Sequence, residues 1–215
     1  MSGLFSLAVL LLSCRHPIVY PAKIGHIRTV VILGNSIVQH PPVAEIGWNN
    51  NWGMAASAMD KDFVHLLIKD IHAKRPDVTV RFMAVSGFER GYRSYDLTKL
   101  DSFRGADLYI FKLAENVLDT ATSFIPYYDH LIRYLDNQNG LNIVVDGFWR
   151  NPINGKLKEY AAGQGFPFIR NSDLSEDKTN MAVGKYQNHG VSVHPSDKGM
   201  QAIEKRIWDY MQVYF

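Results

Sequence analysis

Four residues could share one reaction, and three of them stand near the end of an apolar segment. Ser36 follows a run of β-branched and aliphatic residues, and Gly87 and Asn116 follow two later apolar runs. His194 comes near the C-terminus, directly before Pro195. A serine hydroxyl becomes an effective nucleophile when a neutral imidazole accepts its proton. Ser36 and His194 therefore indicate acyl transfer if the fold brings their side chains together.

The elements that must position these residues alternate between strands and helices. Such alternation indicates a three-layer α/β/α domain, with a parallel sheet of about five strands covered by helices on both faces. If the strands follow the flavodoxin-like order 2-1-3-4-5, a crevice opens between the first and third strands, where Ser36 and Asn116 stand. The expected strands are residues 28–34, 78–85, 107–114, 141–146 and 166–169, and the expected helices are 54–74, 97–103, 125–137, 151–164 and 195–211. The polar segment 171–192 is predicted to be an irregular, mobile flap.

Taken in order, the serine, glycine, asparagine and histidine resemble the SGNH (GDSL-like) hydrolase family, over residues 28–213. The resemblance implies a serine esterase in which Ser36 attacks an ester carbonyl and His194 acts as the base. It also implies an oxyanion hole formed by the backbone N–H groups of Ser36 and Gly87 and the side-chain amide of Asn116. No metal or other cofactor is expected.

Two positions depart from the family pattern. The first motif reads Gly-Asn-Ser rather than Gly-Asp-Ser, which leaves the nucleophile unchanged. The second departure is Val191, which occupies the position three residues before His194 where the family has the aspartate of its triad. Either a Ser–His dyad operates, with a backbone carbonyl orienting the imidazole, or a carboxylate comes from elsewhere in the chain. The candidate carboxylates are Glu115, Asp173, Glu176 and Asp177, and His189 is a rival to His194 as the base.

Aromatic residues near the expected strand ends bear on the substrate. They could stack against sugar rings or cap the core, and the possible substrate-binding residues are Trp48, Trp52, Phe88 and Trp149. The leading hypothesis is hydrolysis of a short acyl ester, such as acetyl, on a carbohydrate or another small molecule. The alternatives are a glycan-binding protein with weak or no catalysis, and a lipase or thioesterase of the same family. A nucleotide binder is disfavoured because the chain has no Gly-rich phosphate loop.

The N-terminus and the composition indicate an exported single-domain protein. Residues 1–14 resemble a signal peptide that ends in a bacterial lipobox, Leu-Leu-Ser-Cys, although no Lys or Arg precedes the apolar run. An N-terminal strand or tail is the alternative. We expect a linker over residues 15–27, one domain over 28–215, and a periplasmic or membrane-anchored lipoprotein with lipid at Cys14. A net charge of +2 gives no reason to expect nucleic acid as a partner.

Overall fold

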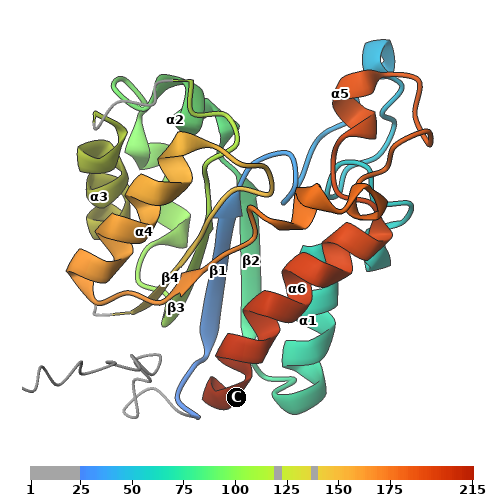
Figure 1. The fold of residues 1–215 in the computed structure, drawn as a ribbon. Coiled ribbons are helices and arrows are strands. Elements are labelled where there is room, and N and C mark those ends of the chain that lie inside the picture. Colours follow the sequence, from blue (N-terminus) through green and yellow to red (C-terminus); the bar gives the residue numbers. More distant parts are fainter. Residues whose placement is uncertain (1–24, 119–122, 137–139) are drawn as a thin grey trace, which may run out of the picture.

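The computed structural model describes residues 25–118, 123–136 and 140–215. The expected signal segment 1–14, Cys14 and most of the expected linker lie outside these residues. The described chain forms three layers, with a central sheet between two groups of helices (Figure 1). None of the described helices has the length and apolar character that crossing a bilayer requires.

The sheet contains five parallel strands in the order β2-β1-β3-β4-β5, as the sequence predicted. The central strands β1, β3 and β4 are almost entirely buried, because helices cover both faces of the sheet. This explains why they read as continuous apolar runs. The strands are β1 Thr29–Gly34, β2 Thr79–Ala84, β3 Leu108–Lys112, β4 Leu141–Val145 and β5 Phe168–Ile169.

Helices α1 and α6 lie on one side of the sheet, and α2, α3 and α4 lie on the other (Figure 1). The short helix α5 precedes α6 in the chain. The α-helices are α1 Phe63–Lys74, α2 Ser86–Gly91, α3 Phe124–Leu135, α4 Pro152–Gln164, α5 His189–Ser192 and α6 Asp197–Met211. The 3-10 helices are η2 Ala44–Ile46, η3 Met59–Lys61, η4 Leu97–Phe103, η5 Leu174–Glu176, η6 Lys178–Asn180 and η7 Gln212–Tyr214.

Each central strand contributes side chains to two separate cores. Val30 and Ile32 of β1 pack with α1 and α6, whereas Val31 and Leu33 pack with α2, α3 and α4. This division follows from the strand geometry, in which successive side chains point to opposite faces. Fully burying one such side chain contributes about 1.5–3 kcal/mol. The two cores therefore fix the level at which β1 ends, and with it the position of the residues that follow.

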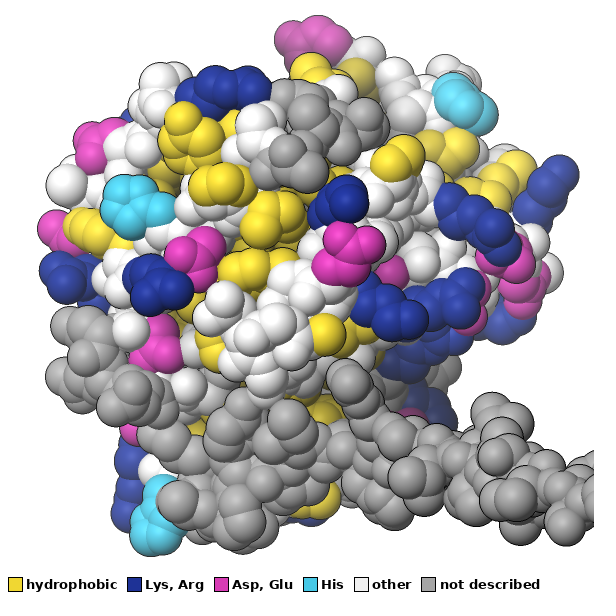
Figure 2. Space-filling model, turned by 60° about the vertical axis from the view of Figure 1, so that its left-hand side comes forward, with side chains coloured by type: hydrophobic (Ala, Val, Ile, Leu, Met, Phe, Trp, Pro, Cys, Tyr) yellow, Lys and Arg dark blue, Asp and Glu magenta, His cyan; other side chains and the backbone are white. Residues whose placement is uncertain are grey.

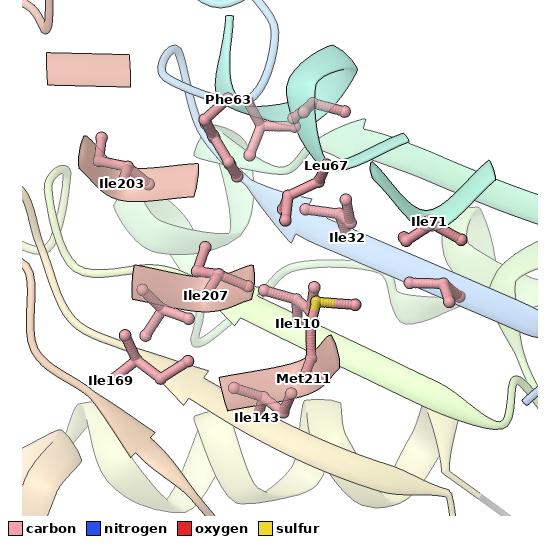
Figure 3. Packing of buried hydrophobic residues seen from close by; sticks show 14 of the residues in the cluster. Ile32, Phe63, Leu67, Ile71, Ile110, Ile143, Ile169, Ile203, Ile207 and Met211 are labelled. Carbon is pink, nitrogen blue, oxygen red and sulfur yellow. The ribbon is translucent and has the colours of Figure 1, made fainter. Parts of the chain in front are cut away.

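The core between the sheet and α6 is shown in Figure 3. Ile207 and Met211 of α6 lie beside Ile110 and Ile143 of the central strands. All four side chains are fully buried. This packing fixes the position of α6, whose N-terminal end follows His194 closely in the chain.

The helix expected from Met54 begins nine residues later, at Phe63. Ala55 has a φ of 73°, in the left-handed region that an α-helix does not contain. The buried carboxylate of Asp62 then accepts hydrogen bonds from the N–H of Gly53 at 3.0 Å and of His65 at 2.8 Å. Asp62 therefore caps α1 and holds the preceding turn against it, so the expectation of one long helix is wrong.

Three other expectations need correction. The last helix begins at Asp197, because the Ser196 hydroxyl accepts the Gly199 N–H at 3.3 Å and caps it, which leaves Pro195 outside the helix. Helix α2 directly after β2 was not expected. The segment 171–192 contains η5, η6 and α5 rather than irregular chain throughout.

Charged side chains of both signs mix on the surface. On the face shown in Figure 2, Asp and Glu side chains lie among those of Lys and Arg. Many exposed pairs are close enough to interact, such as Lys205 with Asp209 at 2.7 Å and Arg133 with Asp129 at 2.7 Å. Exposed pairs of this kind contribute about 0–1 kcal/mol each, so the buried cores dominate stability.

Candidate active site

The fold brings Ser36, Gly87, Asn116 and His194 to one pocket of about 550 Å³. Ser36 is the second residue after β1, Gly87 is the second residue of α2, and Asn116 follows the end of β3. His194 lies between α5 and α6. The pocket therefore opens at the carboxyl ends of β1, β2 and β3, where ligands bind in open parallel sheets.

Ser36 and His194 are in direct contact. The Ser36 Oγ lies 2.8 Å from His194 Nε2, and His194 Nδ1 lies 2.6 Å from the carbonyl oxygen of Gly190. A carbonyl oxygen can only accept a hydrogen bond, so Nδ1 must carry the proton of the neutral ring. Nε2 then presents its lone pair to the serine hydroxyl. This tautomer is the one that a general base needs.

The charge state of His194 also suits a base. Burial lowers the pKa of His194 to about 4, although the Gly190 carbonyl and the negative charge of Glu115 act in the opposite direction. The imidazole is therefore neutral at neutral pH and able to accept a proton. His189, the rival candidate, is an exposed residue at the start of α5 and does not line the pocket.

Among the described residues, no carboxylate makes a hydrogen bond to His194. Asp173 instead accepts from Arg206 at 2.6 Å, and Asp177 accepts from Lys198 at 2.9 Å. The other two candidates are engaged as well, Glu176 with Arg150 and Glu115 with Lys112. Val191 is fully buried. The geometry is thus that of the dyad considered from the sequence, with the Gly190 carbonyl in the place of the acid.

Two of the expected oxyanion donors face the same pocket. Gly87 belongs to the first turn of α2, where backbone N–H groups have no acceptor within the helix. Asn116 holds its side-chain amide between two neighbours: Nδ2 donates to Glu89 at 2.7 Å, and Oδ1 accepts from Arg90 at 2.7 Å. Each amide nitrogen carries two hydrogens. One N–H of Asn116 therefore remains for a substrate oxygen.

A buried polar network that the sequence did not predict lies beneath the pocket. Glu89 is fully buried and accepts hydrogen bonds from Asn35 Nδ2 at 3.1 Å and from the Ala114 N–H at 2.8 Å. Burial and the nearby negative charge of Glu115 raise the pKa of Glu89 to about 7. Glu115 also accepts from Asn35, at 2.7 Å, and pairs with the fully buried Lys112. Asn35 of the Gly-Asn-Ser motif is thus tied to two carboxylates.

The aromatic residues divide between the pocket and the core. Trp149 lines the pocket, with its ring edge-on to His194 at 5.3 Å between centroids. Trp48 and Phe88 are almost wholly buried, which corrects the expectation that they contact substrate. Trp52 is half-buried and packs against the core, with its ring 6.0 Å from that of Trp48. Trp48, Trp52 and Phe88 therefore fit the other possibility considered from the sequence, in which the aromatic rings cap the core.

Metal-binding side chains are not clustered in the part of the chain that the structure describes. No group of three or more His, Cys, Asp or Glu residues there is arranged to hold a metal ion.

Comparisons with known proteins agree at the level of the fold. No protein-family model matches the sequence, and no curated protein matches it. A two-domain esterase active on acetylated mannans (CEX), crystallised with mannopentaose, is 16% identical with a TM-score of 0.55; the match covers 86% of this chain and 49% of that chain. This chain therefore spans about half of that esterase.

Matches to two further solved structures extend over almost the whole length of those chains. A protein described as a GDSL-like lipase from Bacteroides ovatus ATCC 8483 is 15% identical with a TM-score of 0.56, and the match covers 86% of this chain and 98% of that chain. The acetyl xylan esterase AlAXEase is 14% identical with a TM-score of 0.52, and the match covers 84% of this chain and 98% of that chain. The chain has the SGNH hydrolase fold.

Proposed function

We propose that the protein is a serine esterase with Ser36 as nucleophile and His194 as base. The observation that carries this proposal is the 2.8 Å contact between Ser36 Oγ and His194 Nε2, with the ring tautomer set by the Gly190 carbonyl. A nucleophile in contact with an oriented base is the arrangement that covalent acyl transfer requires. The fold shared with esterases and lipases supports the same conclusion.

The reaction proceeds in two halves. Ser36 Oγ attacks the ester carbonyl while its proton moves to His194 Nε2, and the resulting oxyanion accepts hydrogen bonds from the N–H groups of Ser36 and Gly87 and from Asn116. Collapse of this intermediate breaks the ester C–O bond, and the imidazolium protonates the departing alcohol. Water then attacks the acyl-serine with His194 again taking the proton, which returns to Ser36 Oγ as the carboxylic acid leaves.

A serine-directed phosphonate tests this assignment. We expect the protein to hydrolyse 4-nitrophenyl acetate and to gain one phosphonate adduct, located by mass spectrometry on the peptide that contains Ser36. Ser36→Ala should lose both properties while its circular dichroism spectrum stays unchanged. Labelling of any other serine, or full activity in Ser36→Ala, would overturn the proposal.

We propose a short acyl ester on a carbohydrate as the substrate. Two of the similar structures are described as acting on acetylated mannans and as an acetyl xylan esterase. The pocket of about 550 Å³ also carries polar side chains, including Gln39 and His40, that suit sugar hydroxyl groups. Acetate release from acetylated mannan and xylan oligosaccharides should exceed the hydrolysis of 4-nitrophenyl palmitate and of palmitoyl-CoA. The reverse preference would favour a lipase or a thioesterase.

We further propose that residues 1–14 direct export and that Cys14 receives a lipid, because Leu-Leu-Ser-Cys resembles a lipobox. Expression of the full chain in a bacterium with radiolabelled palmitate should yield labelled protein in the membrane fraction. Cys14→Ser should abolish the label. Equal labelling of both proteins, or of neither, would contradict this proposal.

A further inference from the structure

The side-chain amide of Asn116 is held at both ends by consecutive residues of α2. Its Nδ2 donates to Glu89 Oε2 at 2.7 Å, and its Oδ1 accepts from Arg90 Nη2 at 2.7 Å. Glu89 is fully buried beneath the pocket, whereas Arg90 is exposed and lines it. The amide is therefore held on its buried side by Glu89 and on its solvent side by Arg90.

These two contacts allow only one orientation of the amide. The guanidinium of Arg90 has donors and no acceptor, so it can pair only with the oxygen of Asn116. The contact with Arg90 excludes the flipped amide in either charge state of Glu89, and the ionised Glu89 carboxylate accepts from the nitrogen. Turning the amide over would set donor against donor at one end and acceptor against acceptor at the other. The remaining N–H of Asn116 is consequently held in one direction.

We propose that Glu89 and Arg90 are positioning residues, which act through Asn116 to aim its free N–H at the substrate oxygen. This inference rests on the proposed esterase function. A donor that is already oriented stabilises a developing oxyanion without reorganising during the reaction. Arg90 also polarises the Asn116 amide through its oxygen, because hydrogen bonds arranged in a chain strengthen one another. The positive charge of Arg90 thus stabilises the oxyanion indirectly, through the Asn116 amide.

Substitution of Arg90 tests the proposal more directly than substitution of Glu89. Asn116 is its side-chain hydrogen-bond partner among the described residues, whereas Glu89 also holds Asn35 and the Ala114 N–H. Replacing the exposed Arg90 therefore removes one contact without opening the core. Glu89→Gln would place an NH₂ group among three N–H donors, so it disturbs Asn35 as well as Asn116.

The kinetic test is a double-mutant cycle between Arg90 and Asn116. Arg90→Gln should lower kcat by about tenfold with KM changed by less than about twofold, a smaller loss than the roughly 10²–10³-fold expected for removing the donor itself. Arg90→Lys, which keeps a charged donor, should recover part of that loss. In the Asn116→Ala background, Arg90→Gln should cause no further loss.

Two results of the double-mutant cycle would overturn the proposal. One is an equal loss from Arg90→Gln in the presence and absence of the Asn116 amide, and the other is a change confined to KM. Arg133→Gln is the matched control, because Arg133 is an exposed arginine on α3 that pairs with Asp129 at 2.7 Å. It should leave kcat and KM at their wild-type values. A loss in this control as large as that of Arg90→Gln would also count against the clamp, that is, the hold of Glu89 and Arg90 on the Asn116 amide.

A measurement without turnover separates this proposal from the esterase function. In protein with ¹⁵N-labelled asparagine, the side-chain NH₂ signals of Asn116 are those that disappear in Asn116→Ala. These signals should shift in Arg90→Gln and stay unchanged in Arg133→Gln. Unchanged signals in Arg90→Gln would refute the clamp even in an active enzyme. Shifted signals in a protein that hydrolyses no ester would support the clamp and refute the proposed function.

Discussion

Activity should persist to a lower pH than an ordinary histidine base allows. Burial lowers the pKa of His194 to about 4, from a usual value of 6.5. With a pKa of about 4, roughly nine-tenths of the imidazole is neutral at pH 5, whereas with 6.5 only about 3% is neutral. Since only the neutral ring accepts the serine proton, the two cases differ by about thirtyfold in kcat/KM at that pH.

The assay is the pH profile of kcat/KM for 4-nitrophenyl acetate between about pH 4 and pH 8. Release of nitrophenol would be read at its isosbestic wavelength, and the rate with Ser36→Ala would be subtracted. The fold must be followed in parallel by near-UV circular dichroism. A folded pKa below the unfolded one means that His194 contributes stability above pH 6.5, which is lost as the pH falls toward about 4.

Glu89 titrates in a different range and can be recognised. Its pKa is raised to about 7, so an inflection due to Glu89 would appear near neutral pH and vanish in Glu89→Gln. The inflection due to His194 would remain. A half-maximal rate near pH 6.5 that survives Glu89→Gln, in protein that is still folded, would refute the reasoning about His194.

Five other substitutions have defined outcomes. Asn116→Ala should lower kcat by roughly 10²–10³-fold with little change in KM, measured by steady-state kinetics, whereas a change in KM alone would make Asn116 a residue for substrate binding. Asp173→Asn, Glu176→Gln and Asp177→Asn should each lower kcat by less than about tenfold, since loss of a true triad carboxylate can cost about 10⁴-fold; a loss of that size in folded protein would identify the missing acid. Ile207→Ala should lower the free energy of unfolding by about 2–5 kcal/mol in urea titrations, because it opens a cavity in the core beneath α6, and a loss below about 1 kcal/mol would contradict that packing.

The sequence predicted the sheet well because its strands are buried on both faces. Continuous apolar runs such as the one before Ser36 occur where helices cover both faces of a parallel sheet, and they are easy to recognise. Once the strand order is assigned, the residues at the carboxyl ends of β1 and β3 must meet. The contact between Ser36 and His194 agrees with the pairing expected from the sequence.

Other features leave no trace in a single sequence. The Gly190 carbonyl that orients His194 is a backbone group, and every residue has one. The start of α1 depends on Asp62 bonding to Gly53 as well as to its own helix, which is a tertiary contact. Glu89 reads as an ordinary surface carboxylate until its three hydrogen-bond partners, Asn35, Ala114 and Asn116, are seen.

The buried pair of Lys112 and Glu115 restricts how this chain can change over evolutionary time. Both side chains are almost completely enclosed, at 0% and 4% exposure, so water can replace a lost partner only poorly. Removing one partner of such a pair typically costs about 3–5 kcal/mol, a large share of the roughly 5–15 kcal/mol that keeps a domain folded. Replacing both together by apolar residues would also leave Asn35 and the Phe148 N–H without the acceptor that Glu115 provides. Lineages of this protein are therefore expected to keep both residues, and sequences that have lost only one of them should be rare.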